Sequence, residues 1–336
     1  MACHARLGTA RHDPITLISM SRSIILFSHG SVLCGSGESL LAMAHELEKL
    51  AGCQVGIGYL NYSEPSFADA VDAAVADGAS EITVVPYFLV AGYFVKQKLP
   101  PLIEAAKERH PHITFHMADA MRDHPLMRDI VLACAERTQT IDEWRLWWKV
   151  APEFCRNDAA CPLYDSAFCA SSDSTFATNQ ASNGVAKENP PNSLYKGELQ
   201  NPSSFPRRRE SSVSDSTALL ILVHGSPREE SNIDMYKVVE EVRAAQKYFY
   251  VQVGFLECND PDIPKAIEKC ISAGANRIIA VPYFLHAGRH VANDLPELLE
   301  EASRQYPQIE FLMGDYLGRE PSLAKVLLQL AVAAGL

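Results

Sequence analysis

The chain has 336 residues, 47% of them hydrophobic and 21% charged, which is typical of a globular protein with room for two domains. The formal net charge of −11 excludes a general nucleic-acid-binding surface, because phosphate contacts need a basic face. The sequence contains no apolar run of the ~20 residues that would span a bilayer, and residues 1–20 lack the apolar centre of a secretory signal. We therefore expect a cytoplasmic protein without nucleic-acid or membrane partners.

The N-terminal half predicts alternating strands and helices. Residues 1–20 read as an extraneous tail, and the run RSIILFSHGS (22–31) then predicts a buried strand that ends in a histidine. The stretch ESLLAMAHELEKL (38–50) has apolar residues at helical spacing. Three more short apolar runs, QVGIGYL, EITVVPYF and ITFHMA, alternate with helical stretches. This alternation predicts an α/β lobe with a four-stranded parallel sheet covered by helices on both faces.

A segment of different composition follows, from residue 139 to 216. It begins with an aromatic cluster that includes Trp144, and it continues rich in Ser, Asn and Pro. Such a chain cannot offset its ordering entropy by burying apolar surface, so we expect a mostly disordered, inserted linker. Its cysteines Cys155, Cys161 and Cys169 form no CxxC pair, which makes a zinc or iron–sulfur site the less favoured interpretation.

The C-terminal half repeats the first. VPYFLHAGRHVANDLP (281–296) matches VPYFLVAGYFVKQKLP (85–100), and ALLILVHGSP (218–227) matches RSIILFSHGS. Four such blocks align in the same order, which indicates a tandem duplication. We therefore expect two flavodoxin-like lobes, residues 21–138 and 217–336, with the linker between them.

Three side chains of the second half are expected to meet at one edge of its sheet. His224 and Glu257 end the first and second strands, and His290 follows the third. Ligand sites in open parallel sheets lie beyond the carboxyl ends of the strands. Two imidazoles and a carboxylate there are suited to holding a divalent metal or transferring protons. A single histidine would more simply cap its turn, but the three together favour a site.

The first half keeps only one of these three residues. His29 matches His224, whereas Asn61 and Phe94 stand where the second half has Glu257 and His290. The comparison predicts one working site per chain, in the second half.

Other polar residues flank the expected site. His286 lies four residues before His290, but Gly288 between them makes a shared helix face doubtful, so we assign His286 a supporting role. Arg228 and Arg289 flank the two site histidines, and guanidinium groups bind carboxylates well. An anionic ligand would give these arginines a purpose, although scattered surface arginines are also common.

The pattern VHGS…GFLE…VPYFLHAGRHVANDLP, which covers both repeats in its paired form, resembles the sirohydrochlorin chelatases, the CbiX/SirB-type class II tetrapyrrole chelatases. The resemblance implies two lobes that face each other over a cleft. It implies insertion of Co²⁺ or Fe²⁺ into sirohydrochlorin, on the routes to cobalamin or siroheme. His224 and His290 would then be the paired catalytic and metal-binding histidines, and Glu257 their acidic helper. The metal ion would be a substrate, and no organic cofactor is implied.

The same resemblance extends to the substrate. Arg228, Arg289, His286 and His29 become candidates for binding sirohydrochlorin, whose carboxylates suit cationic partners. Apolar residues of the two VPYFL segments, or the first-half aromatics before the LP motif, are further candidates to pack on the macrocycle. Because one chain supplies both lobes, we expect a monomer. The long linker is not part of the family pattern.

Two other functions compete with the enzyme. A carrier that holds a tetrapyrrole or metal without inserting it would have less need of an acid–base set. A hydrolase or nucleotide-binding enzyme is disfavoured, because the chain has no GxSxG elbow, P-loop or GxGxxG after its first strand. The residue types do not choose among Co²⁺, Fe²⁺ and Ni²⁺.

Overall fold

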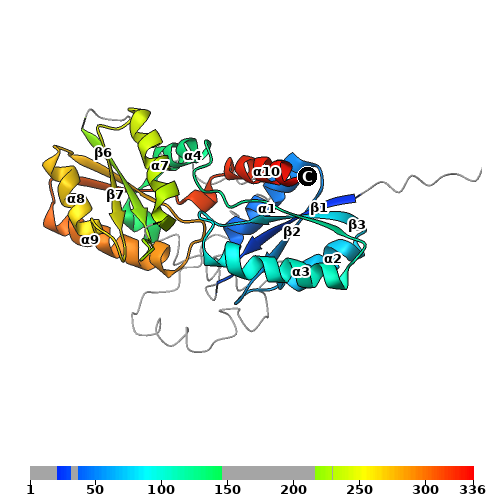
Figure 1. Cartoon of the computed structure of the whole chain (residues 1–336). Coiled ribbons are helices and arrows are strands. Elements are labelled where there is room, and N and C mark those ends of the chain that lie inside the picture. Colours follow the sequence, from blue (N-terminus) through cyan, green and yellow to red (C-terminus); the bar gives the residue numbers. More distant parts are fainter. Residues whose placement is uncertain (1–20, 32–36, 146–215, 229) are drawn as a thin grey trace, which may run out of the picture.

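The computed structural model describes residues 21–31, 37–145, 216–228 and 230–336. It forms two α/β lobes, coloured blue to cyan and yellow to orange in Figure 1. The expectations about residues 1–20 and about the linker cysteines lie outside the described residues. Within the described ranges, no helix combines the length and apolar character needed to cross a bilayer.

The first lobe contains a four-stranded parallel sheet in the order β2-β1-β3-β4, as expected. Its elements are β1 (Ser21–Ser28), α1 (Glu38–Ala51), β2 (Gln54–Tyr59), α2 (Phe67–Ala76), β3 (Ala79–Pro86), a π-helix (Phe94–Lys98), α3 (Leu99–Arg109) and β4 (Thr114–Met117). Helix α4 (Met127–Glu136) and the short strand β5 (Thr138–Gln139) complete the repeat.

The second lobe repeats this pattern and gains a strand. Its elements are β6 (Thr217–Val223), α7 (Glu230–Ala244), β7 (Tyr250–Phe255), α8 (Ile263–Ser272), β8 (Arg277–Pro282), a second π-helix (His290–Asp294), α9 (Leu295–Gln305), β9 (Glu310–Gly314), a 3₁₀ turn (Leu317–Arg319) and α10 (Leu323–Ala334). The sheet order is β5-β9-β8-β6-β7. The expected four strands are parallel, and β5 of the first repeat adds a fifth, antiparallel strand along β9.

Each sheet buries one face against two helices of its own repeat. In the first lobe, apolar residues of α2 and α3 pack on alternate residues of β1 and β3, including Ile25, Phe27 and Val84. In the second lobe, α8 and α9 cover the corresponding face. Strands buried on both faces read as continuous apolar runs, which is why the strands could be found in the sequence.

The last helix of each repeat packs against the other lobe. Helix α4 lies on α7, β8 and β9, whereas α10 lies on α1, β3 and β4 (Figure 1). One hydrophobic core therefore runs through both lobes, from Leu26 and Leu40 through Val131 to Leu219 and Val239. The division at residues 138 and 217 thus describes the repeats, while the packed units exchange their terminal helices.

Buried ion pairs hold this exchange in place. Arg137, between α4 and β5, donates from Nε to Asp315 Oδ2 over 2.9 Å and from Nη2 to Glu320. Asp315 and Glu320 are only 5% and 6% exposed. Burial alone would lower the pKa of Arg137, but the carboxylate of Glu320 beside it raises that pKa above the ordinary value.

The start of the expected linker is ordered. Residues 141–145 are helical, and Trp144 is buried in the core of the second lobe. Its indole Nε1 donates to the carbonyl of Val291, inside the second π-helix, over 3.0 Å. Trp144 thus belongs to the fold, which corrects the expectation that the linker begins at residue 139.

The strand ends of the two sheets meet between the lobes. His286, after β8, places Nε2 3.0 Å from Oγ of Ser28, the last residue of β1. The His286 ring also contacts Tyr87, after β3, with ring centroids 5.3 Å apart. Because both partners follow strands of the first sheet, the carboxyl edges of the two sheets face one another.

Candidate metal and active site

His224 is the first residue after β6, on a turn that only glycine permits. Gly225 has φ +92°, and a Cβ there would lie 2.0 Å from the carbonyl oxygen of Glu257. The Glu257 amide donates to the His224 carbonyl over 2.9 Å, so the two loops are in direct backbone contact. His224 and Glu257 are both exposed. The HGS motif therefore places an imidazole and a carboxylate side by side at the strand ends.

Asn259 secures these loops to the following helix. Its Oδ1 accepts from the Ser226 amide over 2.7 Å and from Asn232 Nδ2 over 3.3 Å. Asn232 lies on α7 and is buried. The position of His224 is thus fixed by backbone and side-chain hydrogen bonds from two elements.

His290 begins the second π-helix. Its Nδ1 lies 2.6 Å from Oδ2 of Asp294, which is four residues along the same helix. Because a carboxylate accepts, Nδ1 carries the proton, and Nε2 is left as the lone-pair nitrogen. The His290 side chain is 35% exposed and that of Asp294 26%. Single π-turns often occur at functional sites, and this one carries His290 at its first position.

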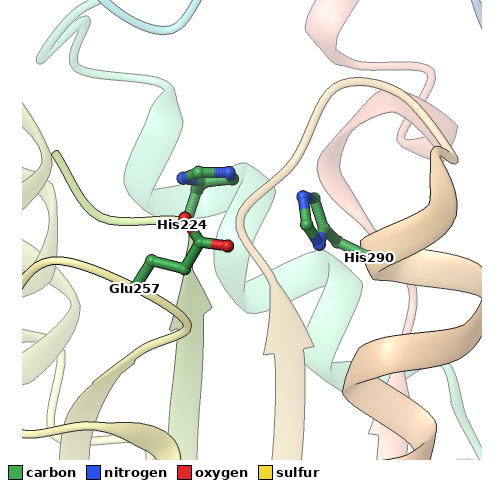
Figure 2. A group of neighbouring side chains, drawn as sticks. All are labelled: His224, Glu257 and His290. Carbon is green, nitrogen blue, oxygen red and sulfur yellow. The ribbon is translucent and has the colours of Figure 1, made fainter.

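The three residues predicted from the sequence meet here. One ligand atom from each of His224, Glu257 and His290 lies within 4.8 Å of the others. The two imidazole rings lie 5.0 Å apart between centroids, at 81°. Figure 2 shows the side chains converging from two loops and the helix. Ligands on opposite sides of one ion are about 4 Å apart, so the set is close to metal-binding spacing, with open positions toward solvent.

A pocket of about 350 Å³ adjoins this cluster. It is lined by Leu256, Glu257, Asp294, Glu297 and Leu298, so three of its five lining residues are acidic. Carboxylates attract a hydrated divalent cation. The arrangement thus provides an anionic approach to the histidine pair.

The other predicted residues are not members of the three-residue cluster. His286 contacts Ser28 and Tyr87 of the first lobe and does not join His224 and His290. Arg228 is exposed. Arg289 is 77% exposed, and its Nε lies 3.6 Å from Asp294 Oδ1.

The first-lobe candidate and the apolar candidates also differ in position. His29 lies in the first lobe, against Tyr62 and Phe94. Of the VPYFL residues, Tyr283 and Leu285 are buried in the core, whereas the Phe284 ring lies 6.5 Å from that of His224.

Sequence reasoning missed Asp294. Its i, i+4 spacing from His290 in HVAND was the available signal, since those positions share one helix face. Gly288, two residues before His290, and the unknown start and end of the helix made this pairing hard to recognise. The carboxylate–histidine pair is the usual device that fixes the tautomer of a metal-binding imidazole.

Comparison with known proteins finds relatives for both repeats. The CbiX family model matches residues 23–138 and 218–334. A sirohydrochlorin cobaltochelatase of Priestia megaterium is 22% identical over 308 residues, which cover 91% of this chain and 78% of that protein. A chloroplastic sirohydrochlorin ferrochelatase of Arabidopsis thaliana is 32% identical over 106 residues, which cover 32% of this chain and only 47% of that protein.

The fold matches a solved structure over nearly its full length. SirB from Bacillus subtilis with Fe³⁺ superposes with a TM-score of 0.63 at 15% identity, covering 94% of this chain and 96% of that one. The match supports the two-lobe fold, and the family model covers both repeats. The chain therefore belongs to the CbiX family, and it carries two copies of the family's unit in tandem.

Proposed function

We propose that this protein inserts a divalent metal ion, Co²⁺ or Fe²⁺, into sirohydrochlorin. The observation that carries the proposal is the convergence of His224, Glu257 and His290 within 4.8 Å at exposed strand ends. Relatives named as sirohydrochlorin cobaltochelatase and ferrochelatase support it. The metal is a substrate, and the reaction needs no organic cofactor.

The reaction exchanges two protons for one metal ion. The macrocycle loses its two pyrrole N–H protons, the ion loses water, and four ring nitrogens replace the protein ligands. The Nε2 atoms of His224 and His290 suit the first task of holding the ion, because a neutral imidazole is a good ligand for it. As the ion leaves, each nitrogen regains a lone pair that can accept a pyrrole proton.

Glu257 and Asp294 have different tasks. Glu257 is exposed and lies beside His224, so it can accept a proton and pass it to solvent. Asp294 is only partly exposed and is not one of the three clustered residues. Its 2.6 Å contact holds the His290 ring in one tautomer. Asp294 is therefore a positioning residue.

The chain can form its cleft without a second copy. Both strand-end edges meet within one chain through His286 and Ser28. We propose that the protein works as a monomer in the cytoplasm and that Arg228 and Arg289, both exposed beside the site, contact substrate carboxylates.

The experiment is anaerobic incubation of sirohydrochlorin with Co²⁺ or Fe²⁺, followed by visible spectra. We expect metallation faster than the uncatalysed rate, and a loss of about 10²–10⁴-fold in His290→Phe, since a single acid–base group contributes that much. The matched control is Phe249→Ala, at the opposite edge of the second sheet. Bound tetrapyrrole with only background metallation would instead identify a carrier.

A further inference from the structure

The first lobe repeats the backbone turn and the backbone hydrogen bond of the candidate metal site. Gly30 has φ +85°, and a Cβ there would lie 1.8 Å from the carbonyl of Asn61. The Asn61 amide donates to the His29 carbonyl over 3.0 Å, as Glu257 does to His224. Ser63 Oγ takes the place of Asn259, in contact with the Ser31 amide over 3.0 Å. The turn after β1 has therefore kept its form.

The side chains on this scaffold have changed in one direction. Where the second lobe has His290 and Asp294, the first π-helix has Phe94 and Lys98. Where the second lobe has Cys258 and Arg289, the first has Tyr62 and Tyr93. A metal ligand, its carboxylate partner and two polar neighbours are replaced by three aromatic rings and a cation. Simple loss of function would not favour aromatic residues at three positions.

These rings form one connected surface. The Phe94 ring lies 4.5 Å from that of His29 and 5.8 Å from that of Tyr93, between centroids. The Tyr62 ring lies 5.6 Å from His29. Tyr62 and Tyr93 are 51% and 49% exposed, so both rings are open to a ligand. We call His29, Tyr62, Tyr93, Phe94 and Lys98 the first-lobe platform.

The platform is cationic where the metal site is acidic. Lys98 Nζ lies 5.5 Å from the Tyr93 ring centroid, and Lys96 on the same π-helix is exposed. The corresponding pocket of the second lobe is lined by Glu257, Asp294 and Glu297. A ligand that is both a flat π-system and a polyanion matches the rings and lysines of the platform, while Arg228 and Arg289 of the second lobe remain available to its other carboxylates.

We infer that the first-lobe platform binds a flat, conjugated macrocycle that bears carboxylates. The inference rests on the proposed function and assigns its two parts to different lobes. The platform stacks against the macrocycle and pairs with its carboxylates through Lys98. The facing edge of the second lobe supplies the metal, because the two strand-end edges meet through His286 and Ser28. Duplication has thus produced a macrocycle site and a metal site from one scaffold.

The test is the binding of metal-free sirohydrochlorin to the full chain under anaerobic conditions, measured by quenching of protein fluorescence. We expect the double variant Tyr62→Ala/Tyr93→Ala to bind about tenfold or more weakly, since ring stacking of this kind contributes that much. Phe249→Ala is the matched control, because Phe249 is 52% exposed at the amino edge of the second sheet. Its affinity should equal that of the unmodified protein.

A second pair tests the charge. Lys98→Ala should weaken binding in low salt more than in high salt, whereas Lys107→Ala, on α3 and paired with Glu104, should change neither. Unchanged affinity in both the tyrosine and Lys98 variants, in a protein that binds and metallates sirohydrochlorin, would overturn the platform and leave the proposed function standing. Weakened binding in a protein that cannot metallate would support the platform and overturn the proposed function.

Discussion

The two lobes present nearly the same backbone and opposite chemistry at facing edges. His29 and His224 both follow a strand, both precede a left-handed glycine, and both place Nδ1 3.2 Å from that glycine's carbonyl. Beyond this shared histidine, one lobe adds an imidazole and carboxylates, and the other adds aromatic rings and lysines. A strand-end scaffold therefore fixes where side chains converge, while the residues on two loops and a π-helix differ between the lobes.

The two lobes also differ in the ion pairs that link them to each other. Helix α7 of the second lobe carries Asp234, whose carboxylate accepts from Arg122 of the first repeat over 2.9 Å. The corresponding position of α1 is Ser39, a buried side chain. The second lobe, which holds the candidate metal site, is thus bound more firmly to the exchanged segment before α4.

The largest expected effect is on the stability of the fold, from a substitution at the junction of the two lobes. Replacing Arg137 by Ala would leave Glu320 buried without its cation, while Asp315 would keep its pair with Arg319. We expect the free energy of unfolding to fall by about 3 kcal/mol, measured by urea denaturation of the full chain. Lys247→Ala, which breaks only the exposed pair with Glu136, is the control and should leave the midpoint nearly unchanged. Equal midpoints for both variants would show that the exchange does not depend on this cluster.

A smaller effect, on Co²⁺ affinity, distinguishes the positioning role of Asp294 from direct binding of the metal in the second lobe. Asp294→Asn should weaken Co²⁺ binding by roughly 10–100-fold, because the amide no longer fixes the His290 tautomer. Asp294→Glu should recover part of the affinity. Glu297→Gln, which lines the same pocket without contacting His290, is the control. If Asp294→Asn binds Co²⁺ as tightly as the unmodified protein, the Asp294–His290 contact has no part in metal binding.

The smallest effect concerns acid stability. Lys237 on α7 donates to Asp123 of the first repeat over 2.7 Å, and this hydrogen bond lowers the Asp123 pKa from its ordinary value of 3.8. A lowered carboxyl pKa stabilises the folded state above the ordinary value, and this stability is lost as the pH falls through the lowered one. Lys237→Ala should therefore unfold at slightly higher pH in an acid titration followed by circular dichroism. A matching unfolding profile for Lys107→Ala and Lys237→Ala would contradict this assignment, since Lys107 pairs with Glu104 on its own exposed helix face.

Much of the fold and of the candidate site could be predicted from the sequence, because the sequence signals for them are local. Continuous apolar strands, helices with one apolar face and a histidine at a strand end predicted two parallel sheets and the cluster of His224, Glu257 and His290. The repeat itself supplied the comparison with Asn61 and Phe94. Strand-end convergence follows from topology alone, so no contact had to be known beforehand.

The features that the sequence concealed are long-range. An amphipathic helix shows that it is buried but not against which sheet, so the exchange of α4 and α10 left no trace. The same holds for Trp144, whose partner Val291 is 147 residues away. The contact of His286 with Ser28 in the other lobe also could not be foreseen from the sequence. Each of these depends on how the lobes pack together.

The central claim is that one lobe alone holds the metal, and the stoichiometry of Co²⁺ binding tests it most directly. An anaerobic titration followed by the visible cobalt spectrum should saturate at one ion per chain. His224→Ala should abolish this binding, whereas His29→Ala, the same change on the matching turn of the first lobe, should leave it intact. Two ions per chain, or a loss of cobalt binding in His29→Ala, would contradict the division of labour between the lobes.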